Sequence, residues 1–320
     1  MSETALRILP HTEEGVAEGA HLITNGDLVA FPTETVYGLG ADARNGRAVA
    51  AIYDTKGRPS FNPLIVHVAD LSAAREIAEF SPQAHLLARL FWPGPLTLVL
   101  PLHEGHGLSS LVTAGLATVA LRVPVHPAAQ ALLHAVGGPV AAPSANLSGR
   151  ISPTTAAHVN KGLRGKSVGV LDAGPCTVGL ESTIVAPGHP PRLLRAGGTP
   201  VEEIERALSM PLASAGEGIS APGQLSSHYA PAQKVRLNAA APTSDEVFLG
   251  FGPMDATLNL STAGDLSEAA ANLFDYLHRL DEADAPIAVA PIPDKGLGRA
   301  INDRLRRAAA PRSSSGAPGV

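Results

Sequence analysis

Two cations stand two residues apart where a predicted helix ends and a loop begins. The segment Lys56-Gly57-Arg58 follows the helical pattern of 48–56 and enters a loop that contains glycine and proline. Such a loop can aim an ammonium and a guanidinium in the same direction, which suits the several negative charges of a polyphosphate. The alternative is a solvated helix end, where cations are common because they complement the helix dipole.

Two further polar side chains fall on predicted strands of strongly apolar character. Thr118 and Arg122 share one face of the strand predicted at 119–123, because side chains alternate along a strand. A guanidinium on a mostly apolar strand needs a salt-bridge partner or a ligand. His67 lies in the strand predicted at 63–68. A buried structural histidine and a ligand-binding histidine both remain open for this position.

Hydroxyl groups and another arginine occur at predicted strand ends, near glycines. Ser144 follows the strand predicted at 140–142, Ser182 opens the strand predicted at 182–186, and Arg195 closes the strand predicted at 192–195. The sequence shows no base that would activate Ser144, so a hydrogen bond to phosphate or backbone is favoured, with simple capping as the alternative. These groups and the loop cations together favour phosphoryl or nucleotidyl transfer, in which positioning and charge stabilisation do most of the catalysis.

Several familiar site motifs are absent from the sequence. It has no Gly-x-x-x-x-Gly-Lys-Ser/Thr loop, no Gly-x-Gly-x-x-Gly after the first strand and no Gly-x-Ser-x-Gly elbow. His103 and His106 are separated by glycine-containing sequence and lack the spacing of a zinc-binding helix. We therefore expect surface-loop histidines there and no metal site built from protein side chains.

Composition and charge exclude several classes of protein. The 320 residues include 32 Gly and 28 Pro, too many for a helical bundle, and 45% hydrophobic residues, too many for a disordered chain. The net charge of -5 gives no basic excess, so no tight direct tRNA binding is expected. A lone cysteine, Cys176, and the lack of an apolar leader or membrane-length apolar run predict a cytoplasmic protein with no membrane association.

Strand and helix patterns alternate around these side chains, which predicts an α/β fold. Helices are predicted at 15–25, 48–56, 71–80, 82–91, 127–136, 201–208, 266–280 and 300–310, and the segment 31–40 is predicted to turn. Strands are predicted at 28–31, 63–68, 96–100, 119–123, 140–142, 168–172, 182–186, 192–195, 235–237, 246–251 and 287–290. We expect a catalytic domain at 1–208, a linker covering the active site at 209–232, and a small α/β domain with a frayed tail at 233–320.

Motifs along the chain occur in the order seen in YrdC-type domains. They are 31–40 (FPTETVYGLG), 56–64 (KGRPSFNPL), 92–97 (WPGPLT), 122–124 (RVP), 144–146 (SAN) and 181–183 (EST), followed by 228–231 (HYAP) and 296–304 (GLGRAINDR). The chain resembles the long, two-domain threonylcarbamoyl-AMP synthases over nearly its whole length. The resemblance implies an N-terminal YrdC-type twisted mixed sheet flanked by helices, and a small C-terminal Rossmann-like α/β domain.

The resemblance also implies a reaction. The family makes threonylcarbamoyl-AMP and pyrophosphate from L-threonine, bicarbonate and ATP. Mg²⁺ would be carried by the ATP phosphates and by water, so it needs no cage of protein carboxylates. The product would pass to a tRNA threonylcarbamoyl transferase complex that modifies tRNA beside the anticodon.

The resemblance assigns roles to individual residues. The catalytic residues would be Lys56 and Arg58. The residues that bind ATP would be Lys56, Arg58, Asn62, Thr118, Ser144, Ser152, Arg195 and Tyr229, the last reaching from the linker to cover the nucleotide. The residues that bind L-threonine would be Thr35, His67, Arg122 and Ser182, with Arg122 holding the carboxylate.

Two other functions compete with this one. A non-catalytic RNA-binding or assembly factor could use the same domain, but the acidic balance and the lack of interleaved aromatics argue against it. A carbamoyl-transfer enzyme of hydrogenase maturation should carry acylphosphatase-like and cysteine-rich zinc segments. The single cysteine counts against that alternative.

Overall fold

One mixed sheet of eleven strands is the scaffold of the N-terminal unit in the computed structural model, which describes residues 6–214 and 228–311. Its strand order is β1-β8-β2-β3-β7-β4-β6-β5-β9-β10-β11, with both parallel and antiparallel neighbours. The strands are β1 (Arg7–Pro10), β2 (Val29–Pro32), β3 (Tyr37–Asp42), β4 (Ile65–His67), β5 (Leu96–Pro101), β6 (Thr118–Arg122), β7 (Val140–Ala141), β8 (Gly169–Asp172), β9 (Thr183–Ala186), β10 (Arg192–Arg195) and β11 (Ala213–Ser214).

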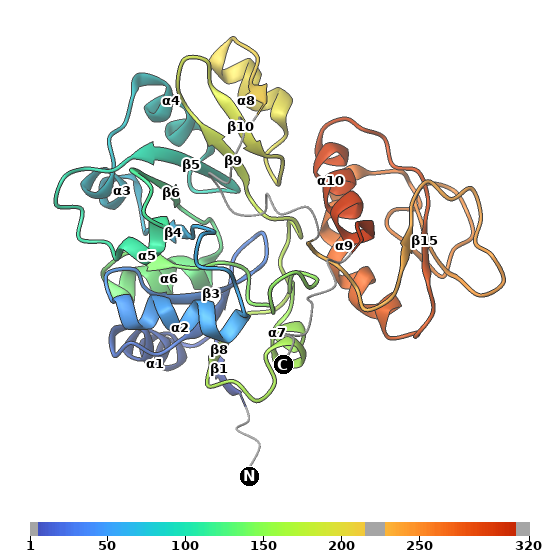
Figure 1. Ribbon diagram of the computed structural model, residues 1–320, viewed down its shortest axis with the longest axis horizontal. Helices are drawn as coiled ribbons and strands as arrows, with labels where there is room; N and C mark the ends of the chain where they lie inside the picture. Colours follow the sequence, from blue (N-terminus) through green and yellow to red (C-terminus); the bar gives the residue numbers. More distant parts are fainter. Residues whose placement is uncertain (1–5, 215–227, 312–320) are drawn as a thin grey trace, which may run out of the picture.

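Helices flank this sheet (Figure 1), and apolar side chains fill both of its faces. Along β2, Val29 and Phe31 pack into one apolar cluster and Ala30 into another, as the alternation of side chains requires. The helices are α1 (Glu13–Thr24), α2 (Gly46–Lys56), α3 (Leu71–Ile77), α4 (Pro82–Phe91), α5 (Ser110–Thr113), α6 (Pro127–Val136), α7 (Ala156–Gly162) and α8 (Val201–Leu208).

The segment predicted to turn at 31–40 is only partly a turn. Its second half forms β3, which pairs antiparallel with β2 from Tyr37 onward. A Cβ atom at Gly40 would lie 2.8 Å from the ring of Phe31 and 3.1 Å from Val140. This glycine is therefore required by close packing between neighbouring strands, and the prediction from composition mistook it for a turn signal.

The C-terminal unit is a four-stranded parallel sheet with two long helices. The strand order is β12-β15-β13-β14, and every pair is parallel. The elements are β12 (Val235–Arg236), β13 (Val247–Gly250), β14 (Leu258–Asn259), α9 (Leu266–Asp281), β15 (Ile287–Val289) and α10 (Leu297–Ala309). The predicted class, a mixed sheet with helices plus a smaller α/β domain, is confirmed.

The two units share an apolar cluster. Figure 1 shows α9 and α10 on the side of the smaller unit that faces the larger one. Val36 and Leu180 of the larger unit are buried in one cluster with Leu273, Phe274 and Ile301 of the smaller unit. Because burial of apolar area drives association, this cluster holds the two units against each other.

Gly179 lies where the backbones of the two units come close together, and it gives a first prediction. It has φ +72°, and a Cβ atom there would lie 2.5–2.6 Å from backbone atoms of Ala270 and Ala271. A left-handed alanine costs about 1–2 kcal/mol. We expect Gly179→Ala to lower the free energy of unfolding by clearly more than that. The control is Gly174→Ala, which has φ +82° and open space around the added Cβ. Equal stability of the two variants in urea unfolding would contradict the close contact.

A stacked histidine pair at the same interface gives a prediction for acid stability. The rings of His158 and His278 lie 4.0 Å apart, and Nε2 of His278 donates to the carbonyl of Ser152 at 3.2 Å. Burial, followed by the charge of His158, lowers the pKa of His278 from 6.5 to about 3. Between these values the unfolded chain binds a proton that the folded chain does not, so stability falls as the pH drops through this window.

The measurement compares the wild type with His278→Gln, which removes the titrating ring and keeps a donor. Going from pH 7 to pH 5, we expect the variant to lose about 1–2 kcal/mol less unfolding free energy than the wild type. Identical losses would show that His278 does not carry this pH dependence.

Candidate active site

A cavity opens where the β2–β3 turn, the ends of β4 and β6, the segment after β7 and the β9–β10 pair come together. It is the place where the structure brings most of the predicted binding residues into one lining. The predicted residues in that lining are Thr35, Arg58, His67, Arg122, Ser144, Ser182, Arg195 and Tyr229.

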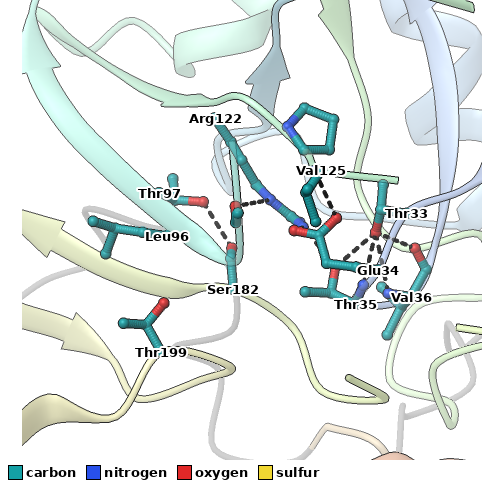
Figure 2. A network of polar contacts seen from close by, with 12 residues as sticks. Thr33, Glu34, Thr35, Val36, Leu96, Thr97, Arg122, Val125, Ser182 and Thr199 are labelled. Atoms are coloured by element: carbon teal, nitrogen blue, oxygen red, sulfur yellow. Dashed lines mark hydrogen bonds and ion pairs between the residues drawn. The ribbon is translucent and has the colours of Figure 1, made fainter. Parts of the chain in front are cut away.

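Arg122 lines this cavity and is held in place by contacts to the surrounding protein (Figure 2). It ends β6, and its Nη2 forms a buried ion pair with Glu34 Oε1 at 2.6 Å. Its Nη1 donates to Thr35 Oγ1 at 2.8 Å, and its Nε donates to the carbonyl of Gly94 at 3.2 Å. Glu34 also accepts the backbone N–H of Val125 at 3.2 Å. The sequence left open a salt bridge or a ligand for Arg122, and the structure shows the salt bridge while keeping the side chain in the cavity lining.

His67 stands beside Arg122 on the neighbouring parallel strand. The two residues are directly paired in the register of β4 and β6. His67 is buried, and its Nδ1 has no hydrogen-bond partner within 6–214 and 228–311. Burial, then the charge of Arg122, lowers the pKa of His67 to about 3. The ring is therefore neutral at pH 7 and offers a hydrogen-bonding atom to whatever enters the cavity.

Arg195, predicted to bind ATP, contacts Ser182, predicted to bind L-threonine. Its Nε and Nη2 donate to the carbonyl of Ser182 at 3.2 and 2.9 Å, and Nη2 also reaches Ser182 Oγ at 3.2 Å. That hydroxyl lies 2.7 Å from Thr97 Oγ1 (Figure 2). A residue assigned to ATP thus touches one assigned to threonine.

Arg58 is held by its own loop. Its Nε and Nη2 donate to the carbonyls of Asn62 at 3.3 Å and Pro63 at 3.0 Å. Burial lowers the pKa of Arg58 to about 10, which leaves it charged at neutral pH. The loop therefore presents a desolvated cation, whose attraction for an anion is stronger than that of a solvated one.

Other residues predicted to bind ATP do not contribute to the lining found among the described residues. These residues are Lys56, Asn62, Thr118 and Ser152. The Lys56 ammonium donates to the carbonyls of Ser144 and Asn146, both at 2.5 Å, and burial lowers its pKa well below the ordinary value. Ser152 donates to Glu181 Oε1 at 2.5 Å. The ATP roles of these residues stay predictions.

The second unit supplies a residue that the sequence interpretation missed as a site component. Arg304 of α10 is fully buried, and its Nε pairs with Glu181 Oε2 at 2.9 Å. Its Nη1 donates to the carbonyl of Ala196 at 2.8 Å, and its guanidinium carbon lies 5.2 Å from the ring centre of Tyr229. Because Glu181 and Tyr229 line the cavity, Arg304 supports two lining residues without lining the cavity itself.

Tyr229 enters the cavity from the end of the predicted linker. It is buried with φ +61°, and its ring contacts that of His228 at 4.1 Å. Burial lowers the pKa of His228 to about 3, so this ring is also neutral. Residues 215–227 of the predicted linker lie outside the described residues. The predicted boundaries of the linker and of both domains stay predictions.

The carboxylate in the lining, that of Glu181, is already engaged by the protein. Glu181 accepts hydrogen bonds from both Ser152 and Arg304. In the described ranges, no three His, Cys, Asp or Glu side chains gather where they could hold a metal ion. His103 and His106 belong to no such cluster. In the same ranges, no helix has the length and apolar character needed to cross a membrane.

Comparisons with known proteins identify the family of this chain. Residues 21–197 match the family model described as telomere recombination, and residues 199–310 match the C-terminal domain of threonylcarbamoyl-AMP synthase. The threonylcarbamoyl-AMP synthase of Bacillus subtilis is 41% identical, over 93% of each chain. The chain belongs to the threonylcarbamoyl-AMP synthase family.

Other members of this family are similarly close. The threonylcarbamoyl-AMP synthase of Pyrococcus abyssi is 40% identical, over 90% of this chain and 92% of its own. The crystal structure of P. abyssi Sua5 complexed with L-threonine superposes with a TM-score of 0.87 at 38% identity, covering 96% of this chain and 98% of that one. Membership favours the enzyme over the RNA-binding alternative.

Proposed function

We propose that this chain forms threonylcarbamoyl-AMP and pyrophosphate from L-threonine, bicarbonate and ATP. The observation that carries the proposal is a single cavity with two kinds of anion-binding groups. Arg122, His67 and Ser182 line it together with Arg58 and Arg195. Family membership and the L-threonine complex of the P. abyssi protein support it.

Threonine binds in this proposal through its carboxylate and its amine. The guanidinium of Arg122 cannot move far, because Glu34, Thr35 and Gly94 hold its three nitrogens. It therefore offers its remaining N–H groups to the substrate carboxylate in a fixed direction. The neutral ring of His67 bonds the amine and places no second positive charge beside it.

Adenylation follows in the same cavity. The amine of threonine and bicarbonate give an N-carboxylate with loss of water. One of its oxygens then attacks the α-phosphorus of ATP, and the bond to the pyrophosphate oxygen breaks. Negative charge builds on phosphate oxygens during this step, and Arg58 and Arg195 stabilise it. Tyr229, buried over the cavity, helps to keep out water that would hydrolyse the mixed anhydride.

Mg²⁺ fits this site only as a companion of ATP. The cavity lining is rich in cations, and Glu181 is committed to Arg304 and Ser152. The phosphates and water would therefore hold the ion, which when bound neutralises phosphate charge.

The product then serves tRNA modification in the cytoplasm. We expect it to pass to a tRNA threonylcarbamoyl transferase complex, which attaches it beside the anticodon. The chain's net charge of -5 makes tight direct tRNA binding by this protein unfavourable.

Pyrophosphate release tests the proposal. ATP supplied with both L-threonine and bicarbonate should give continuous release, and omission of either should stop it. Release that is indifferent to both co-substrates would overturn the proposed function.

A further inference from the structure

A separate cleft lies in the C-terminal unit and shares no lining residue with the active-site cavity. It has a volume of about 250 Å³ and opens beside the ends of β12 and β15, next to α10. Its apolar part is formed by Leu237, Val289 and Leu305, and its polar groups include Asp294, Asn302 and Arg306. Pockets for drug-sized ligands measure about 300–1,000 Å³, so this cleft suits a smaller molecule.

The position of the cleft is the one at which open α/β sheets bind ligands. Leu237 directly follows β12, and Val289 is the last residue of β15. These two strands are parallel neighbours, so their carboxyl ends meet at one edge. Ligands of such sheets bind in the crevice outside the carboxyl ends of the strands.

The polar rim of the cleft carries two opposite charges, on Asp294 and Arg306. Among the described residues, neither Asp294 nor Arg306 forms an ion pair within 4.0 Å. Both are exposed at the rim. Asn302 connects them, since its Nδ2 lies 3.5 Å from Asp294 Oδ1 and Arg306 follows it by one helical turn.

A nucleotide does not match this cleft. In Rossmann-like domains the phosphates bind at the N-terminus of the helix that follows a strand. Here the first N–H group before α10, that of Gly296, already donates to Glu202 Oε1 at 3.2 Å. The residues that line the cleft also include no aromatic ring on which a base could stack.

We infer that the cleft binds a small zwitterion, an α-amino acid with an aliphatic side chain. Arg306 receives its carboxylate and Asp294 its ammonium, because each charge finds its opposite at the rim. The aliphatic side chain then lies on Leu237, Val289 and Leu305, where burial of apolar area favours it. The binding site belongs to the C-terminal unit and does not depend on the proposed reaction.

Calorimetric titration of the full chain with L-valine, L-leucine and L-isoleucine tests the inference. We expect at least one to bind at one site per chain. Arg306→Ala and Asp294→Asn should each weaken that binding by about tenfold or more, as loss of a charge-assisted bond implies. Arg299→Ala is the matched control, since this exposed arginine of α10 lies outside the cleft. It should bind as the wild type does.

Two further probes make the result specific. Arg122→Leu combined with Glu34→Leu removes the cation of the active site that would hold a carboxylate, so binding retained in that double variant places the ligand elsewhere. The amine-free acid 4-methylpentanoate should bind more weakly than L-leucine. The inference fails if none of the three amino acids binds, if binding ignores Arg306 and Asp294, or if the acid binds as well as the amino acid. Pyrophosphate release by the same samples tests the proposed function separately.

Discussion

Arg122→Ala is expected to lower threonine-dependent pyrophosphate release by at least about 100-fold, since the substrate carboxylate loses its charged donors. The variant also leaves Glu34 buried without its cation. Removing one partner of a buried ion pair costs about 3–5 kcal/mol of stability. Steady-state rates and urea unfolding measured on the same protein separate these two effects.

A double variant separates the loss of activity from a loss of folding. Arg122→Leu combined with Glu34→Leu removes both buried charges, and such replacements are often neutral or stabilising. We expect its unfolding free energy to recover toward that of the wild type while its activity stays absent. A stable double variant with normal threonine kinetics would show that Arg122 does not hold the substrate.

Arg304→Ala is expected to damage the site from the other unit. It removes the cation that pairs with Glu181 and lies over Tyr229. We expect a loss of about 3–5 kcal/mol in unfolding free energy, because the carboxylate of Glu181 would be left buried without its cation. The rate of pyrophosphate release from ATP should fall as well, since Glu181 and Tyr229 both line the cavity.

The matched control for Arg304 is Arg299→Ala on the same helix. Arg299 pairs with Glu202 at 3.3 Å at the protein surface, where such a pair contributes about 0–1 kcal/mol. Arg304→Lys adds a test of geometry, because an ammonium cannot reproduce the fork of a guanidinium. Wild-type stability and activity of Arg304→Ala would show that the second unit does not support the cavity.

The sequence predicts the site's cations better than their partners. The strand patterns place Arg122 and Arg195 at or near the ends of predicted strands, where side chains of neighbouring strands can meet. Glu34 reaches Arg122 only because the β2–β3 turn folds over β6, at a separation of 88 residues. No local pattern encodes that contact.

Arg304 carries a sequence signal for a buried cation. Ile301, Leu305 and Ala308 are buried on the same helix, and Arg304 lies three residues from the first and four from the last. That spacing places Arg304 on the apolar face. A cation on a buried face requires a partner, which here comes from the other unit.

Lys56 is singled out by the sequence but does not line the cavity. Two neighbouring cations in the sequence predict two groups for a polyphosphate, but the Lys56 ammonium lies among the carbonyls of Ser144 and Asn146. Carbonyl contacts of this kind depend on how a distant loop folds, which residue types and spacing do not show.

The most direct measurement follows labelled carbon from bicarbonate. The chain is incubated with ¹⁴C-bicarbonate, L-threonine and ATP, and the nucleotides are separated at once. We predict label in a product that also contains AMP and threonine, formed in step with pyrophosphate and lost when threonine is omitted. Pyrophosphate release without labelled nucleotide, or labelling that does not require threonine, would contradict the proposed reaction.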